Sequence, residues 1–184
     1  MLNQTQATIV KFRNYVIQQS RSNLSKLRKN DTKKLYNSLK GEILTEDNYT
    51  LVGFSMDEHG LFVDKGVKGA DPSQVSKNAK IRGQQAPNSP YSFRGKRPPS
   101  APLEKWAKRK NLRLRDEKGK FQKGNYKTLG IILAKNIWAR GIKPSLFFTK
   151  PFEAGYKKYI DVDLVKAFGQ DVGTIVSTNL KDLK

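Results

Sequence analysis

Few residues in this sequence have side chains suited to acid–base or metal chemistry. His59 is the only histidine and there is no cysteine. These counts exclude a thiolate zinc site, an iron–sulfur cluster, a cysteine nucleophile and a multi-histidine metal site. A Ser-His-Asp triad would need His59, which follows Asp57 and Glu58 in a predicted hairpin turn ending at Gly60. We expect His59 to be a turn residue, and we predict no catalytic residue, no metal site and no cofactor.

Carboxylates are the remaining candidates, since they bind Mg²⁺ in nucleases. The candidates are Asp57, Glu58, Asp64 and Asp71, and separately Asp161, Asp163 and Asp171. Their spacing fits no diagnostic motif. Asp161 and Asp163 are better explained as first-turn residues of a helix, and Asp64 as the end of a strand. The glycines form no phosphate-binding loop, so the step from Gly66 to Gly69 is interpreted as a turn. We expect a protein that is not an enzyme, with a metal-dependent nuclease as the alternative.

Positive charge is the strongest chemical signal. The 184 residues include 36 Lys and Arg against 16 Asp and Glu, a net charge of +20. Residues 80–127 hold 15 of the basic and 3 of the acidic side chains, a net +12. Such a block binds an acidic partner or remains a solvated, repelling surface. Nucleic acid is one such partner, because phosphates attract cations without base readout.

Two groups of residues in this block are candidate contacts. The segment 91–99 joins aromatic rings to cations and a stiff Pro-Pro pair, a composition that suits stacking on bases or anchoring a subunit. For partner contacts we select Tyr91, Phe93, Arg94, Arg97 and Trp106. For anionic partners we select Lys105, Lys108, Arg109, Arg113 and Arg115. The first three of these cations share one face of a predicted helix at 102–112.

The elements that position these residues alternate in type. Apolar periodicity predicts helices at 6–29 and 32–39, the second capped by Asp31 or Thr32. Alternation predicts strands at 41–46 and 48–56, and Leu61-Phe62-Val63 as a returning strand. Residues 70–102 are expected to form a long irregular loop, because apolar residues are sparse there and no period appears.

The second half is predicted to be mainly helical. A helix at 128–140 ends at Gly141, and an aromatic segment at 145–159 closes the core. A last helix at 162–179, capped by Asp161, is expected to turn its apolar side chains inward. The inward residues are Val162, Val165, Phe168, Val172 and either Ile175 or Val176.

This order of elements predicts an α+β fold, with a small antiparallel sheet packed with N- and C-terminal helices and a long basic insertion loop. We expect one domain over 1–184, made of a helix plus β-hairpin (6–69), a basic insertion (70–127) and a helical closing half (128–178). No run of apolar residues is long enough to span a membrane, and no secretory signal is visible.

Three segments carry a resemblance to a known family. They are the helix-to-strand step Leu35–Ile43, the segment Phe62–Gly69, and Gly141–Phe148 with its Gly-Ile-Lys-Pro-Ser-Leu-Phe-Phe sequence. With these segments the chain resembles the tail-completion, or head–tail connector, proteins of tailed bacteriophages. It departs from their pattern at Asp64 and Lys65, where a glutamate and an aromatic residue are usual, and it lacks the first proline of their Pro-x-Pro-Phe step.

The resemblance implies a structural virion protein without a catalytic site. It implies a homo-oligomeric ring in the neck, between the portal or connector and the tail proteins, around the DNA channel, assembled in the host cytoplasm. The basic segment then faces either DNA or a neighbouring acidic protein, and both alternatives stay open. A stand-alone, non-sequence-specific nucleic-acid-binding protein is the alternative function.

Overall fold

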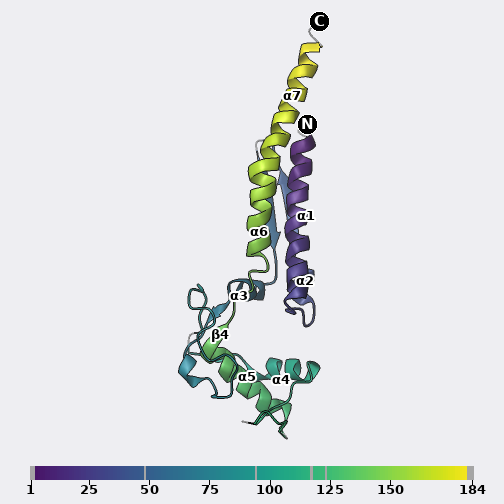
Figure 1. Ribbon diagram of the computed structural model, residues 1–184. Coiled ribbons are helices and arrows are strands. Elements are labelled where there is room, and N and C mark those ends of the chain that lie inside the picture. The colour runs from purple at the N-terminus through teal and green to yellow at the C-terminus, as the bar shows by residue number, and fades with distance from the viewer. Residues whose placement is uncertain (1–2, 48, 94, 117, 123, 182–184) are drawn as a thin grey trace. The chain divides into compact units, whose positions relative to one another are not determined.

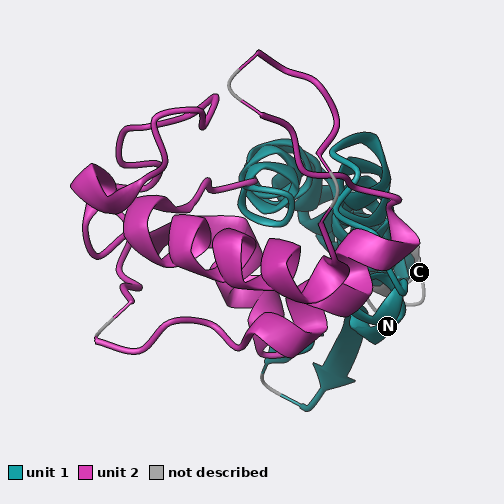
Figure 2. Cartoon of the chain, turned by 90° about the horizontal axis from the view of Figure 1, so that it is seen from below, with its two compact units in different colours: residues 1–57, 146–184 teal, residues 58–145 magenta. Residues whose placement is uncertain are grey.

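The chain forms two compact units in the computed structural model, which describes residues 3–47, 49–93, 95–116, 118–122 and 124–181, with side chains through 178. Unit 1 combines residues 1–57 with 146–184, and unit 2 comprises residues 58–145 (Figure 2). These boundaries differ from the subdivisions at 69 and 127 predicted from the sequence. The expectation of one domain stays a prediction.

Unit 1 is built around a long N-terminal helix, α1 (Asn3–Lys26). Its buried apolar positions recur every three to eight residues, which makes one continuous stripe. They are Ile9, Phe12, Val16 and Leu24. This stripe packs against a C-terminal helical run consisting of α6 (Thr149–Gly155), the π-helical stretch η2 (Tyr156–Leu164) and α7 (Val165–Lys181). The run lies antiparallel to α1 (Figure 1).

A two-stranded antiparallel sheet, β1 (Lys40–Thr45) and β2 (Thr50–Ser55), completes unit 1. Its register pairs Ile43 with Val52 and Lys40 with Ser55. Val52 and Phe54 are partly buried, whereas Leu51 is 57% exposed, so the even-numbered side chains of β2 face inward. The strands predicted at 41–46 and 48–56, the presence of N- and C-terminal helices and the α+β fold class are confirmed.

The short helix α2 (Lys34–Ser38) is held by α1 rather than by a side-chain cap. Arg21 donates from Nε to the Tyr36 carbonyl at 3.1 Å and from Nη2 to the Leu39 carbonyl at 2.9 Å. The N-cap residue is Lys33, in the left-handed region with φ 56° and no cap hydrogen bond. The predicted cap at Asp31 or Thr32 is therefore wrong, because the preceding turn places Lys33 at the start of the helix.

Aromatic rings form the centre of unit 1, as predicted from residues 145–159. The Phe12 ring lies edge-on to Phe54 at 5.9 Å and to Phe152 at 5.8 Å between centroids. Phe148 contacts Phe54 at 5.6 Å, and Phe147 is fully buried. Three segments far apart in the sequence thus meet in one cluster, and edge-on ring pairs stabilise it beyond simple area burial.

The predicted start of the last helix at Asp161 is wrong. The backbone stays helical from Thr149 to Lys181, and the π-helical stretch η2 runs through Asp161 without a break. The predicted inward positions are wrong too. Ala167 and Asp171 are the buried positions of α7, and Asp171 bonds the backbone amides of Gln4 and Thr5 at the start of α1. Later turns of α7 extend past the described start of α1 (Figure 1).

Five apolar side chains of α7 consequently remain on the surface. Ala167 and Asp171 occupy the buried side of α7, so the larger apolar side chains lie on another face. We call them the α7 stripe: Val165 (67% exposed), Phe168 (51%), Val172 (39%), Ile175 (43%) and Val176 (51%). Val162 in η2, also predicted to be inward, is 45% exposed.

Unit 2 opens with a helix where the sequence predicted a hairpin turn and a returning strand. Residues His59–Lys65 form α3, with Gly60 and Asp64 buried on its inner side. The Ser145 amide donates to the carbonyls of both Val63 and Asp64 at 3.1 Å. This long-range contact satisfies carbonyls at the end of α3, where a helix lacks partners of its own. The run Leu61-Phe62-Val63 is therefore helical, and β1–β2 remains two-stranded.

Unit 2 closes on itself through two very short strands, β3 (Val67–Lys68) and β4 (Gly141–Ile142). They pair antiparallel, with Val67 opposite Ile142 and Lys68 opposite Gly141. A Cβ on Gly69 would lie 2.5 Å from Gly141 N, and one on Gly66 would lie 2.5 Å from Ile142 O. We call this pairing the β3–β4 clasp. The step from Gly66 to Gly69, interpreted as a turn, is thus largely a strand, and its glycines permit close backbone approach.

The basic insertion is only partly a loop. It contains the 3₁₀ turn η1 (Pro72–Gln74) and helix α4 (Ser100–Arg109), which packs along α5 (Tyr126–Arg140). Asn125 caps α5 by accepting a hydrogen bond from Thr128 N at 2.8 Å. The helices predicted at 102–112 and 128–140 are confirmed: α4 begins two residues earlier and ends three residues earlier, and α5 begins two residues earlier and ends at the predicted residue. None of the helices in the described parts of the chain is long and apolar enough to cross a membrane.

Candidate functional sites

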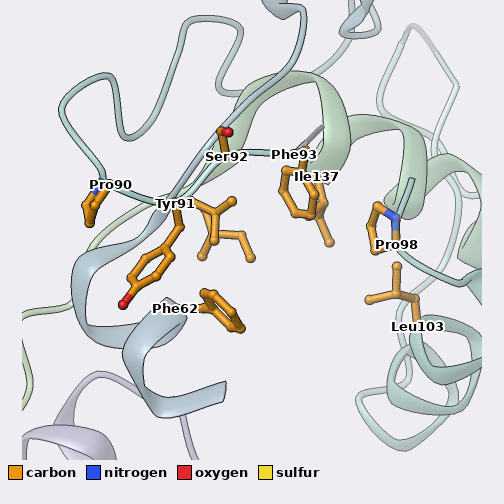
Figure 3. Close-up of a pocket in the computed structure, with 10 residues that line it drawn as sticks. Phe62, Pro90, Tyr91, Ser92, Phe93, Pro98, Leu103 and Ile137 are labelled. Atoms are coloured by element: carbon orange, nitrogen blue, oxygen red, sulfur yellow. The ribbon is translucent and has the colours of Figure 1, made fainter. Parts of the chain in front are cut away.

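An apolar groove of about 510 Å³ lies on unit 2 (Figure 3). Its lining residues come from the 90–98 segment and from α3, β3, α4, α5 and β4. The lining residues are Phe62, Val67, Pro90, Tyr91, Ser92, Phe93, Pro98, Leu103, Ile137 and Ile142. Figure 3 shows Tyr91 and Phe62 at one end and Pro98 with Leu103 at the other. We call this the apolar groove.

Backbone hydrogen bonds fix the groove wall, although its sequence predicted an irregular loop. Lys68 N donates to the Tyr91 carbonyl at 2.7 Å, and Phe93 N donates to the Lys68 carbonyl at 3.1 Å. Residues 91–93 therefore pair with β3 through a parallel bridge between Lys68 and Ser92. Ser89 Oγ also donates to the Gly66 carbonyl at 2.7 Å. The wall is consequently tied to the β3–β4 clasp.

The structure brings some of the predicted partner-contact residues together. Tyr91 stands edge-on to Phe62 at 4.8 Å between centroids, and Phe93 lines the same groove. The Arg97 guanidinium lies 5.2 Å from the Trp138 ring, a cation–π distance, while Arg97 itself is exposed. Trp106 is half-buried in α4 and does not line the groove. Arg94 lies outside the described residues.

The predicted anionic-partner residues occupy a second, separate surface of unit 2. Lys105, Lys108 and Arg109 are exposed on α4. Arg113 and Arg115 are exposed four and six residues beyond the end of α4, on a small turn-and-bridge structure. We call residues 113–122 the basic hairpin, because Arg115 forms an antiparallel bridge with Phe121.

Sequence reasoning missed Phe121 and Phe62. Phe121 lies in the segment that the sequence predicted only as a basic insertion (70–127), yet its ring is the platform beneath two arginines. The alternation of Arg113, Arg115 and a later aromatic residue across Gly119 was the available signal. Phe62 was placed in a strand, which hid its contact with Tyr91.

The carboxylates of the described residues do not gather into a metal-binding cluster. Among the described residues, no three His, Cys, Asp or Glu side chains gather closely enough to hold a metal ion. Asp71 accepts hydrogen bonds from the Ser73 hydroxyl at 2.5 Å and from Ser73 N at 3.0 Å at the start of η1, and these bonds lower the pKa of Asp71. Asp171 bonds the start of α1 instead. His59 is the first residue of α3.

Comparison with known proteins adds no assignment. The chain matches no family model, no curated protein and no solved structure. The apolar groove, the α7 stripe and the basic hairpin are the surfaces of the described residues that bear on function.

Proposed function

We propose that this chain is a structural virion protein, a neck or tail-completion subunit that forms a homo-oligomeric ring joining the portal or connector to the tail around the DNA channel. The observation that carries the proposal is the presence of two different exposed apolar surfaces on one chain. The apolar groove is concave, and the α7 stripe is a row of projecting side chains. Such a pair suits a head-to-tail contact between identical subunits.

Ring closure requires this kind of asymmetry. A two-fold dimer uses the same patch on both subunits, whereas a cyclic ring joins two different patches repeatedly. We propose that the α7 stripe of one subunit occupies the apolar groove of a second copy. Val165, Phe168 and Val172 follow one another at spacings of three and four, which is the pattern a helix uses to enter a groove. Tyr91 and Phe93 then serve as anchors, as expected for aromatic residues at interfaces.

The segments that carry the resemblance to phage neck proteins meet in the fold. Two of the three segments that carry it, Phe62–Gly69 and Gly141–Phe148, supply the paired strands of the β3–β4 clasp. Residues separated by more than 70 positions therefore act together in one structural element. This gives a physical reason for their joint presence in the sequence.

The test is the mass of the purified chain by light scattering at micromolar concentration, without DNA. We expect a closed multiple of 20.9 kDa. Val176→Asp should reduce the mass to that of one subunit, because it places a charge in the α7 stripe. Gln170→Asp is the matched control, since it adds the same charge at an exposed polar position of the same helix and should leave the ring intact.

The opposite result is also defined. A single-subunit mass that persists when portal and tail proteins are added, with no ring in electron micrographs, would overturn the proposal.

The second candidate, a stand-alone nucleic-acid-binding protein, is favoured by the density of cations between 105 and 127. It predicts a single chain that associates only when DNA or RNA is present.

A further inference from the structure

The basic hairpin has a defined backbone. Gln122 N donates to the Leu114 carbonyl and Asp116 N to the Lys120 carbonyl, both at 2.9 Å. Asp116 Oδ1 accepts from Lys120 N at 2.8 Å, so the carboxylate is used inside the turn. Gly119 has φ +79°, a conformation that other residues rarely adopt. The tip is therefore built to hold its side chains in place.

The base of the basic hairpin is anchored to the rest of unit 2. A Cβ on Gly124 would collide with Leu114 Cδ1, which shows that the Leu114 side chain lies directly against the backbone there. Leu112 N also donates to the Ala107 carbonyl of α4 at 3.0 Å. The cations of α4 and those of the basic hairpin are thus connected through a short, ordered segment.

Phe121 organises two arginines at this site. The Arg115 guanidinium carbon lies 4.3 Å from the Phe121 ring centroid and that of Arg113 lies 5.7 Å from it. The ring itself is 60% exposed. Arg115 uses one donor on the Gly119 carbonyl at 2.9 Å. Because a guanidinium has five N–H donors, both arginines keep donors for an external anion.

The surrounding charge is strongly one-sided. Residues 105–127 contain ten Lys and Arg and two acidic residues, a net +8. Of the two acidic residues, Asp116 bonds within the turn and Glu117 lies outside the described residues. The described cations here are Lys105, Lys108, Arg109, Lys110, Arg113, Arg115, Lys118, Lys120 and Lys127.

The composition of this surface selects between the two kinds of acidic partner. Protein interfaces have an apolar core from which lysine and other charged residues are depleted. Phe121 is the one exposed aromatic ring described within the basic hairpin, and the cations surround it. Protein–DNA interfaces are much more positively charged, and most of their hydrogen bonds go to phosphates and sugars. The basic hairpin therefore fits DNA better than an acidic protein, whereas the apolar groove fits a protein.

We propose that the basic hairpin binds double-stranded DNA, with Arg113 and Arg115 forming a two-guanidinium clamp on backbone phosphates and Phe121 acting as their positioning residue. The inference rests on the proposed function only for the source of the DNA, which would be the genome in the neck channel. Binding requires no base readout, because phosphate charge attracts cations whatever the base sequence. Arginine suits this role since its planar fork matches phosphate geometry.

The experiment measures binding of the full chain to a fluorescent DNA duplex at several salt concentrations. The duplex has about 25 base pairs, the length of a common protein-binding site. Replacing both arginines (R113A/R115A) should lower the slope of log K against log salt by about 1.8, since each phosphate contact contributes about 0.9. Phe121→Ala keeps the net charge and should weaken binding about five- to tenfold by releasing the arginines from the ring.

A matched control removes two exposed cations from unit 1. Lys11 and Lys40 lie on α1 and β1. We expect K11A/K40A to keep the slope and affinity of the original chain within about twofold, because nonspecific charge alone changes these values little when the cations lie outside the contacted surface. Both Phe121 and its two arginines are exposed, so their substitution leaves the core of unit 2 unchanged, and circular dichroism verifies this.

Three results would overturn the inference. The first is an R113A/R115A protein that behaves like the lysine control. The second is equal binding of polyglutamate, with the same loss on substitution, which would assign the clamp to protein carboxylates. The third is tighter binding of single strands that depends on Phe121, which would indicate base stacking. Light scattering on the same samples separates the proposals, because a ring that ignores DNA refutes only the clamp, and a DNA-binding single chain counts only against the ring.

Discussion

Gly69→Ala tests how closely the backbones meet at the β3–β4 clasp. A Cβ at position 69 would meet Ala139 O, Arg140 C and Gly141 N, the last at 2.5 Å. That is about 0.9 Å inside the 3.4 Å at which ordinary van der Waals contact begins. All three atoms belong to the main chain. No side-chain rotation relieves such a clash, so the two segments have to separate.

The cost follows from the hydrogen bonds that separation would strain. Gly69 N donates to Gln84 Oε1 at 2.6 Å, and Gln84 Nε2 donates back to the Gly69 carbonyl at 2.9 Å. Ala70 N bonds the Trp138 carbonyl at 2.8 Å, and Asp71 N bonds the Ala139 carbonyl at 3.0 Å. At about 1 kcal/mol net for each bond, losing half to all of them lowers the free energy of unfolding by about 2–4 kcal/mol. Overpacking elsewhere costs a similar amount.

Urea denaturation combined with amide hydrogen exchange measures this effect and locates it. We expect faster exchange at Ala70 and Asp71, and unchanged exchange in the β1–β2 ladder of unit 1. Gly83→Ala is the control, because a Cβ there meets nothing within 4 Å. It should be neutral or stabilising by up to about 1 kcal/mol, since alanine restricts the unfolded chain. A Gly69→Ala protein as stable as Gly83→Ala, with unchanged exchange, would refute the close approach.

Two further predictions concern helix starts. Asn125→Ala removes the cap of α5 and should lower the free energy of unfolding by about 1 kcal/mol, whereas Asn125→Asp should restore most of it, as measured in urea; equal stability of the two variants would contradict the capping role. Burial raises the pKa of Asp171, but hydrogen bonds from the Thr5 amide, the Thr5 hydroxyl and the Gln4 amide outweigh it and hold the pKa below its ordinary value. The stability that this carboxylate contributes is therefore present above about pH 4 and lost as pH falls through the lower folded-state pKa, so Asp171→Asn should flatten urea midpoints measured between about pH 5 and pH 2. An unchanged acid profile would show that the bonds to α1 do not depend on the charge.

Local patterns predicted the elements whose stability is local. The α5 helix has a clear apolar period and its own stop in Gly141, and the β1–β2 segments show a period of two, whereas the cap at Asn125 was not predicted. Both were predictable because the period of the side chains and the end residues agree. The aromatic cluster was predictable from composition, since so many rings within 15 residues have to be buried together.

The missed features depend on contacts distant in sequence. Leu61-Phe62-Val63 has strand composition, yet the contact of the Ser145 amide with the carbonyls of Val63 and Asp64 accompanies a helix there. Strands of two residues, such as β3 and β4, are too short to show a period. The α7 stripe was assigned to the core because its pattern is amphipathic, but amphipathicity does not say which surface covers the apolar face. Instead, Asp171 and Ala167 lie on the buried side of α7, and the apolar side chains of the α7 stripe are exposed.

Some residues of the apolar groove and the basic hairpin could be predicted from local composition, whereas the others depend on contacts distant in sequence. The aromatic–cation composition of 91–99 identified Tyr91 and Phe93, which line the apolar groove. Positive charge identified Arg113 and Arg115 without their aromatic platform. Phe62, Leu103 and Ile137 come from three other elements, and only the folded backbone of unit 2 places them around the groove.

The β3–β4 clasp has a consequence for how this chain can vary. Unit 2 begins and ends at neighbouring points, because Ser145 bonds Val63 and Asp64 and because Val67 pairs with Ile142. Unit 2 is therefore an insertion of 88 residues, 58–145, in the sequence of unit 1. The two ends of this insertion are held close to each other. Such a segment can vary in sequence as one unit. Its loops can change in length or charge while the helices and sheet of unit 1 keep their own sequence and spacing.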